Sequence, residues 1–143
     1  GIDGSTSTAI GTSVVDEKQT LLITGDLSFL YDSNALWNNY IPKNFRIILV
    51  NNNGGGIFRI LPGNKNTENF DTYFETIHPH TAKQLAEMYH FEYITAIDEV
   101  SLQAALETFY DASEKPKILE VFTPRIENDS TLIDYFKFFN EKK

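Results

Sequence analysis

The chain contains no cysteine among its 143 residues. Neither a disulfide framework nor a thiolate metal site is therefore available to it. Any metal ion that this chain binds must take its ligands from oxygen atoms or from imidazole. The absence of cysteine also agrees with a reducing compartment.

Positive charge is scarce as well. Lys and Arg total 12 against 20 Asp and Glu, which gives a formal net charge of −8, and the acidic residues are scattered along the chain. Proteins bind nucleic acid backbones through clustered Lys and Arg side chains that release counterions. We therefore expect no nucleic acid partner.

Long apolar runs are missing too. No run approaches the roughly 20 residues that a membrane-spanning helix needs, and the first residues lack the charged and then apolar plan of a signal peptide. We expect no membrane span and a cytoplasmic protein. The opening Gly1-Ile2-Asp3-Gly4 resembles the interior of a fold, so we expect a longer protein to continue upstream.

What the chain does have is enough apolar material for one sizeable core, with 41% hydrophobic and 13% aromatic residues. Its length predicts one domain over residues 1–143. Short β-branched runs alternate with longer amphipathic segments, which predicts an α/β fold, doubly wound, with a mostly parallel sheet and helices on both faces. The expected strands are residues 20–24, 46–50, 92–96 and 117–122, and the expected helices are residues 5–15, 33–40, 81–89, 101–112 and 131–140.

Two of these strands run directly into polar residues. The first continues into Gly25-Asp26-Leu27-Ser28, and the second into the run Asn-Asn-Asn-Gly-Gly-Gly at residues 51–56. In open parallel sheets, ligands bind beyond the carboxyl ends of the strands, so we expect both runs at one edge. A carboxylate, an amide oxygen and a glycine carbonyl suit Mg²⁺, whose octahedron a diphosphate completes. Glycine lets backbone N–H groups approach phosphate closely, and Ser28 adds a hydroxyl donor.

A Gly-Asp pair followed about two dozen residues later by Asn-Asn resembles the signature of thiamine-diphosphate enzymes. The resemblance implies that Asp26, Asn52 and the carbonyl of Gly54 hold Mg²⁺ or Mn²⁺. The third asparagine leaves the register open between Asn52 and Asn53, and the alignment of the strand end favours Asn52.

The motifs together resemble one family, the succinyl-enolpyruvyl-hydroxycyclohexene-carboxylate synthases of menaquinone biosynthesis, in their C-terminal domain. They are Gly-Asp-Leu-Ser-Phe-Leu-Tyr-Asp at 25–32, Asn-Asn-Asn-Gly-Gly-Gly-Ile-Phe at 51–58, Leu61-Pro62 and the opening Gly-Ile-Asp-Gly. The resemblance implies a transferase that decarboxylates 2-oxoglutarate and adds the succinyl semialdehyde carbanion equivalent to isochorismate. It also implies that the cofactor contacts Ile2, Gly25, Asp26, Leu27, Ser28, Asn52, Gly54, Gly55 and Ile57.

For the substrates, the resemblance implies an apolar wall of Ile57, Phe58 and Leu61 over the reacting carbon. These enzymes also need a glutamate from a pyrimidine-binding domain, usually that of the partner subunit. No segment here resembles that domain, so we expect no catalytic residue in this chain, no activity from it alone, and a homodimer or homotetramer.

Other interpretations stay open. The chain can belong to another thiamine-diphosphate enzyme, such as an acetolactate-synthase-like enzyme or a 2-oxoacid decarboxylase, or be a non-catalytic phosphate-binding module. Asp26 can be a helix N-cap, and Arg59 can reach a substrate carboxylate or serve another role. We interpret Asp32 as structural, and we expect the aromatic residues of 131–140 to pack on the chain's own sheet.

Overall fold

The computed structural model describes residues 2–63 and 67–141, so Gly1 of the opening motif lies outside the described residues. The described residues form two compact units. One comprises those of Gly1–Asn51 and Thr81–Phe122, and the other those of Asn52–His80 and Thr123–Lys143. We call them the sheet unit and the loop unit and describe each by itself.

The sheet unit contains four strands in the order β1-β2-β4-β3, and every neighbouring pair is parallel. The strands are β1 (Leu21–Gly25), β2 (Arg46–Asn51), β3 (Glu92–Ala96) and β4 (Lys117–Phe122). All four strands were expected from the sequence, to within one residue at each end. The α/β fold and the parallel sheet are confirmed.

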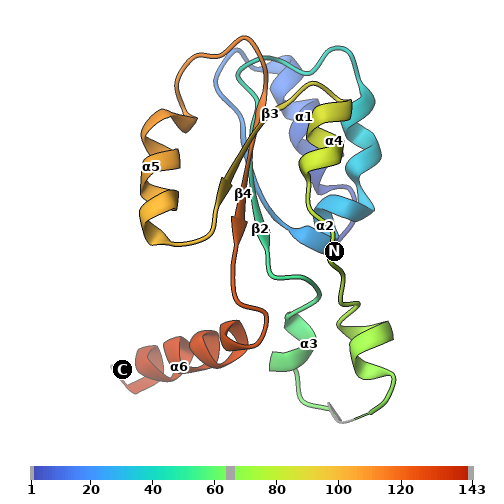
Figure 1. Cartoon of the computed structure of the whole chain (residues 1–143), viewed down its shortest axis with the longest axis vertical. Coiled ribbons are helices and arrows are strands. Elements are labelled where there is room, and N and C mark those ends of the chain that lie inside the picture. Colours follow the sequence, from blue (N-terminus) through green and yellow to red (C-terminus); the bar gives the residue numbers. More distant parts are fainter. Residues whose placement is uncertain (1, 64–66, 142–143) are drawn as a thin grey trace. The chain divides into compact units, whose positions relative to one another are not determined.

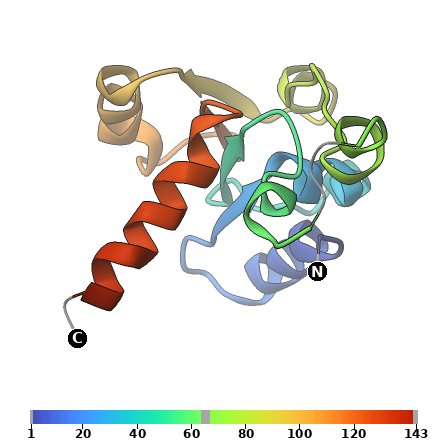
Figure 2. The same cartoon turned by 90° about the horizontal axis from the view of Figure 1, so that it is seen from below.

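Helices cover both faces of this sheet. Figures 1 and 2 show α1 (Ser5–Val15), α2 (Asp26–Tyr31) and α4 (Lys83–Met88) on one side and α5 (Glu99–Phe109) on the other. Because successive strand residues point to opposite faces, β2 supplies both cores. Ile47 and Leu49 are buried in the core that includes α1, α2 and α4, whereas Ile48 packs against the core that includes α5.

The helix predictions were accurate for α1 and less so elsewhere. Helix α2 was missed, since it follows β1 without a loop and its six residues are too few to show a helical period. Residues 33–40 were expected as one helix, but only Ser33–Trp37 form a 3-10 helix, η1. Helix α5 begins at Glu99, earlier than expected, because the N-cap Asp98 forms a capping box with Ser101 in the first turn.

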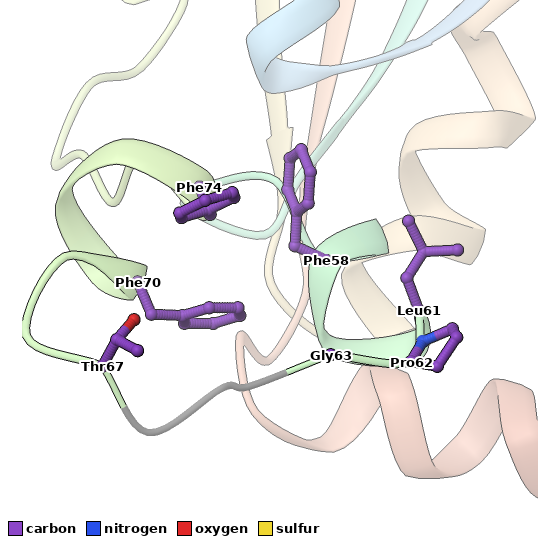
Figure 3. Close-up of a pocket in the computed structure, with 7 residues that line it drawn as sticks. All are labelled: Phe58, Leu61, Pro62, Gly63, Thr67, Phe70 and Phe74. Carbon is purple, nitrogen blue, oxygen red and sulfur yellow. The ribbon is translucent and has the colours of Figure 1, made fainter.

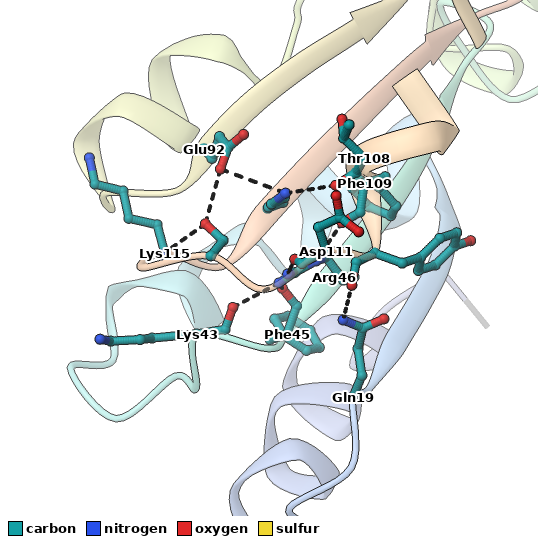
Figure 4. A network of polar contacts seen from close by, with 12 residues as sticks. Gln19, Lys43, Phe45, Arg46, Glu92, Thr108, Phe109, Asp111 and Lys115 are labelled. Carbon is teal, nitrogen blue, oxygen red and sulfur yellow. Dashed lines mark hydrogen bonds and ion pairs between the residues drawn. The ribbon is translucent and has the colours of Figure 1, made fainter. Parts of the chain in front are cut away.

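At the amino-terminal edge of the sheet, the fully buried Arg46 is bonded to backbone carbonyls (Figure 4). Its Nε donates to Phe109 O at 2.8 Å, Nη2 to Asp111 O at 2.6 Å and Nη1 to Lys43 O at 2.7 Å. Burial lowers the pKa of this guanidinium, and the charge of Glu92 opposes that shift. The hydrogen bonds of Arg46 therefore have a structural role at this edge of the sheet.

The loop unit holds α3 (Ile57–Ile60), the π-helix η2 (Phe70–Phe74) and α6 (Glu127–Glu141), and α3 packs against α6. Four aromatic side chains of α6 are 50–55% exposed, and the expectation that they pack on the sheet stays a prediction: Tyr135, Phe136, Phe138 and Phe139. Within residues 2–63 and 67–141, no helix is both long and apolar enough to pass through a membrane.

Candidate functional site

In the sheet unit, the two polar runs leave the sheet at neighbouring positions. Gly25 at the end of β1 pairs with Val50 in β2, and the two strands are parallel. The next residues, Asp26 and Asn51, therefore emerge at the same carboxyl edge, where parallel sheets bind ligands.

Asp26 is 4% exposed and is the first residue of α2. The cap position belongs to Gly25, and the helix has no side-chain cap bond. The interpretation of Asp26 as an N-cap is therefore wrong. One carboxylate oxygen, Oδ1, accepts from its neighbour Leu27 N at 2.8 Å, which fixes the orientation of the carboxylate at the edge.

Two contacts join α2 to the start of α1. The hydroxyls of Ser28 and Ser5 lie 3.1 Å apart, and the carboxylate of Asp32 accepts from Ser7 N at 2.7 Å and from Ser7 Oγ at 2.6 Å. The structural role expected of Asp32 is confirmed, since it satisfies an amide in the first turn of α1. Ile2, in the short segment that precedes α1, is half-exposed.

In the loop unit, the glycine run forms a tight turn against Glu75. Gly55 N donates to Glu75 O at 2.6 Å. Gly54 has φ 151°, and a Cβ placed there would lie 2.7 Å from Glu75 O. Only glycine fits at residue 54, both for its backbone angle and for this close approach.

Asn52 and Asn53, beside this turn, make different contacts. Asn53 has φ 61° and exchanges two bonds with His78: its carbonyl accepts from His78 N at 3.3 Å, and its Nδ2 donates to His78 O at 3.2 Å. The amide of Asn52 instead lies over Gly56, where a Cβ would be 2.7 Å from Asn52 Nδ2. Asn53 therefore stabilises the turn, and Gly56 leaves room for the side chain of Asn52.

The carboxylate of Glu75 is fully buried between two arginines. Arg59 Nε donates to it at 2.7 Å with a second bond from Nη2, and Arg125 Nη1 donates at 2.9 Å. The hydrogen bond with Glu75 raises the pKa of Arg59. Arg59 also lies over the ring of Phe70, 6.0 Å from its centroid. Arg59 is thus paired with Glu75 in this structure, and its reach to a substrate carboxylate stays a prediction.

The loop unit also contains an apolar cavity of about 390 Å³ (Figure 3). It brings together Phe58 and Leu61 of the expected wall, and Phe58 meets Phe74 edge to face at 5.8 Å. Its lining residues are Phe58, Leu61, Pro62, Gly63, Thr67, Phe70 and Phe74. Sequence reasoning missed Phe70 and Phe74, although their four-residue spacing was visible. Ile57 lines a separate cavity of about 250 Å³ with Asn52.

Sequence reasoning also missed Glu120, which is fully buried on β4. It accepts from Asn51 Nδ2 at 2.7 Å, from Ala82 N at 3.0 Å and from Tyr93 OH at 2.5 Å. Burial, together with the hydrogen bond to Glu120, raises the pKa of Tyr93. The sequence signal was a single charge inside the apolar run Ile-Leu-Glu-Val at residues 118–121.

The donors fit a hard cation better than zinc. Within the part of the chain that the structure describes, no three or more His, Cys, Asp or Glu side chains gather as a metal site. The oxygens that follow β1 and β2 are one buried carboxylate, amide oxygens and glycine carbonyls, a set that suits Mg²⁺.

Comparison with known proteins agrees with this chemistry. Residues 4–121 match the family described as "Thiamine pyrophosphate enzyme, C-terminal TPP binding domain". The chain is also similar to proteins named 2-succinyl-5-enolpyruvyl-6-hydroxy-3-cyclohexene-1-carboxylate synthase. That of Christiangramia forsetii is 62% identical over 138 residues, which are 96% of this chain and 24% of the relative.

Two further relatives with the same name come from Flavobacterium psychrophilum and Porphyromonas gingivalis. The first is 64% identical over 137 residues, covering 96% of this chain and 25% of the relative. The second is 44% identical over 140 residues, covering 98% of this chain and 24% of the relative. The chain thus spans about a quarter of the length of these relatives.

Proposed function

The chain belongs to the thiamine pyrophosphate enzymes, as their C-terminal TPP binding domain, and we propose that it anchors the cofactor in a synthase of menaquinone biosynthesis. That synthase decarboxylates 2-oxoglutarate and adds the succinyl unit to isochorismate. The name shared by the relatives at 62% and 64% identity supports this reaction. Residues 1–143 then form one C-terminal domain of a larger multidomain enzyme.

The observation that carries the proposal is the pairing of Gly25 with Val50. It supports a shared ligand, since it starts both polar runs at one edge of the sheet. We assign Mg²⁺ or Mn²⁺ to Asp26, Asn52 and the carbonyl of Gly54. The bonds that Asn53 exchanges with His78 favour Asn52 as the amide ligand.

For the diphosphate, Ser28 offers its hydroxyl, while Gly25 and Leu27 flank the metal-binding carboxylate. Gly55 contributes the shape of the turn, because its N–H is already bonded to Glu75 O. When bound, thiamine diphosphate supplies the thiazolium carbon at which the oxo acid loses carbon dioxide.

Apolar residues support the cofactor and cover its reacting carbon in this proposal. Ile2 and Ile57 support the bent cofactor, and Phe58 and Leu61 cover the reacting carbon. The aromatic cavity behind Phe58 supports this role, since it extends the apolar surface. A wall of this kind excludes water, which strengthens electrostatic interactions and limits unwanted proton transfer.

The assembly is part of the same proposal. The catalytic glutamate comes from a pyrimidine-binding domain of a partner subunit, so the enzyme is a homodimer or homotetramer. It acts in the cytoplasm on small-molecule substrates.

Calorimetric titration with thiamine diphosphate, with and without Mg²⁺, tests the cofactor in the complete enzyme. Asp26→Asn is expected to lower activity with 2-oxoglutarate and isochorismate by about 100-fold or more, since even outer-shell partners of metals contribute 10–100-fold. Asp134→Asn, which alters an exposed carboxylate, is the matched control. Cofactor binding that is indifferent to Mg²⁺ and to Asp26→Asn would contradict the metal assignment. Turnover by this chain alone would contradict the proposal that a partner subunit supplies the catalytic glutamate.

A further inference from the structure

Glu120 is a charged side chain at 0% exposure in a strand whose neighbours Ile118 and Leu119 are buried and apolar. A carboxylate in such a place is costly unless hydrogen bonds satisfy it. An apolar side chain of similar size would fill the same space without that requirement. What the carboxylate adds is three directed hydrogen bonds.

The three donors come from three different segments of the sheet unit. Asn51 is the last residue of β2, Ala82 N precedes α4, and Tyr93 lies in β3. Each donor is neutral, and the distances to Glu120 are 2.5–3.0 Å. The buried carboxylate of Glu120 on β4 therefore links the end of β2 to β3 and to the residue that precedes α4.

The bond to Asn51 matters most, because the next residue in the chain is Asn52. Asn51 is 1% exposed, and its amide nitrogen donates to Glu120. This bond fixes the side chain of Asn51 on one face of the sheet, and strand geometry then fixes where the backbone leaves the sheet. The Asn51–Glu120 pair therefore lies where the polar run of residues 51–56 leaves the sheet.

We propose that Glu120, through Asn51, is a positioning residue for the metal and diphosphate site. The proposal rests on the function proposed above. Neither side chain touches the metal ion. Their pair holds the end of β2 so that Asn52 presents its amide oxygen at the right place.

The pair can be tested by exchanging its donor and acceptor in the complete enzyme. Glu120→Gln is nearly isosteric and removes the charge. Asn51→Asp sets two carboxylates against each other. The double variant Asn51→Asp/Glu120→Gln restores one amide and one carboxylate with their positions reversed, and the oxygen that accepts from Ala82 N and Tyr93 OH is kept.

The readouts are the Kd of thiamine diphosphate, the Mg²⁺ concentration that gives half-maximal binding, and the melting temperature of the cofactor-free enzyme. Each single variant is expected to raise the Kd by about 10-fold or more, the range seen for partners behind metal ligands. The double variant is expected to return within about threefold of the wild type, since one amide–carboxylate bond is restored. Glu92→Gln, at the start of β3 and half-exposed, is the control and should leave the Kd unchanged.

Two results would overturn the inference. One is single variants that bind the cofactor as the wild type does, even if their melting temperatures fall, because that pattern indicates a purely structural role. The other is a double variant that is no better than the single ones. If Asn51→Asp does not fold, the Kd of thiamine diphosphate for Glu120→Gln tests the proposal by itself. An unchanged Kd then refutes it. A wild-type enzyme without Mg²⁺-dependent cofactor binding refutes the proposed function itself, whereas normal wild-type binding with unaffected variants refutes only the role of Glu120.

Discussion

The sheet unit and the loop unit each bury one glutamate completely, and they satisfy it by different means. In the sheet unit, Glu120 accepts from an amide, a backbone N–H and a phenol. In the loop unit, Glu75 accepts from the guanidinium groups of Arg59 and Arg125.

The difference follows from the local architecture. The parallel strands of the sheet unit hold the backbones of Asn51 and Tyr93 in fixed register with β4, so two neutral donors lie within reach of Glu120. Among the described residues of 52–80, the loop unit has only the short helices α3 and η2, and long charged side chains bridge its segments. Charged partners make Glu75 more sensitive to loss of its charge, since two partly buried cations would lose their counterion.

The largest effect on stability is expected from Glu75→Gln, which tests this comparison. It leaves Arg59 and Arg125 beside a neutral amide and is expected to cost about 3–5 kcal/mol of stability. Glu120→Gln, among neutral donors, is expected to cost about 1–3 kcal/mol. Hydrogen exchange of peptides from both units measures the local losses. Glu114→Gln, which breaks an exposed pair with Lys43, is the control. Equal losses for Glu75→Gln and Glu120→Gln would remove the distinction between the units.

A second test uses glycine. Gly54→Ala is expected to destabilise the cofactor-free protein by about 2–4 kcal/mol, through backbone strain and overlap with Glu75 O. Gly11→Ala in α1 meets nothing within 4 Å and is expected to stabilise by about 0.5–1 kcal/mol. Denaturant titration of both variants measures whether their changes in unfolding free energy have opposite signs. A neutral Gly54→Ala would show that the loop unit can relax around Glu75.

Tyr93→Phe tests how the sheet unit depends on a neutral donor. Loss of this bond to a charged acceptor is expected to cost about 1.5 kcal/mol near neutral pH. The pKa of Tyr93 is raised above its ordinary value of 10.0 in the folded protein. Its stabilisation is therefore complete below pH 10.0 and is lost as the pH rises above it, when the unfolded state loses the proton.

The measurement is the difference in unfolding free energy between wild type and Tyr93→Phe on both sides of that pH. This difference in unfolding free energy should be smaller above pH 10.0 than below it. A gap that stays constant would mean that Tyr93 ionises as easily in the folded protein as in the unfolded one.

The smallest effect is expected from Lys137→Ala. Lys137 pairs with Asp134 at 2.8 Å on the surface of α6, and both side chains are about two-thirds exposed. The loss should be below about 0.5 kcal/mol, because water screens the pair. Thermal melting checks it. A loss as large as that of Glu75→Gln would show that charge alone, irrespective of burial, stabilises the loop unit.

The fold was predictable because its signals are local. The runs that became β2 and β4 are mostly apolar between their end residues, with Glu120 as the exception, as strands covered on both faces require. Helix α2 and the 3-10 helix after it were not predictable, since Asp32 breaks the helix by bonding Ser7, 25 residues earlier in the chain. The candidate motifs at Asp26 and Asn52 were visible as sequence, whereas Glu120 and Glu75 were noticed only with their partners in place.

The sequence by itself determined the class of fold, the two strand ends that carry the polar runs, and the resemblance to a cofactor family. Each depends on residues that are neighbours in the chain or follow a fixed period. Only the tertiary structure decided that Asn51 meets Glu120 across 69 residues and that Arg125 meets Glu75 across 50. Such pairs depend on how distant segments pack, and periodicity and spacing carry no information about that.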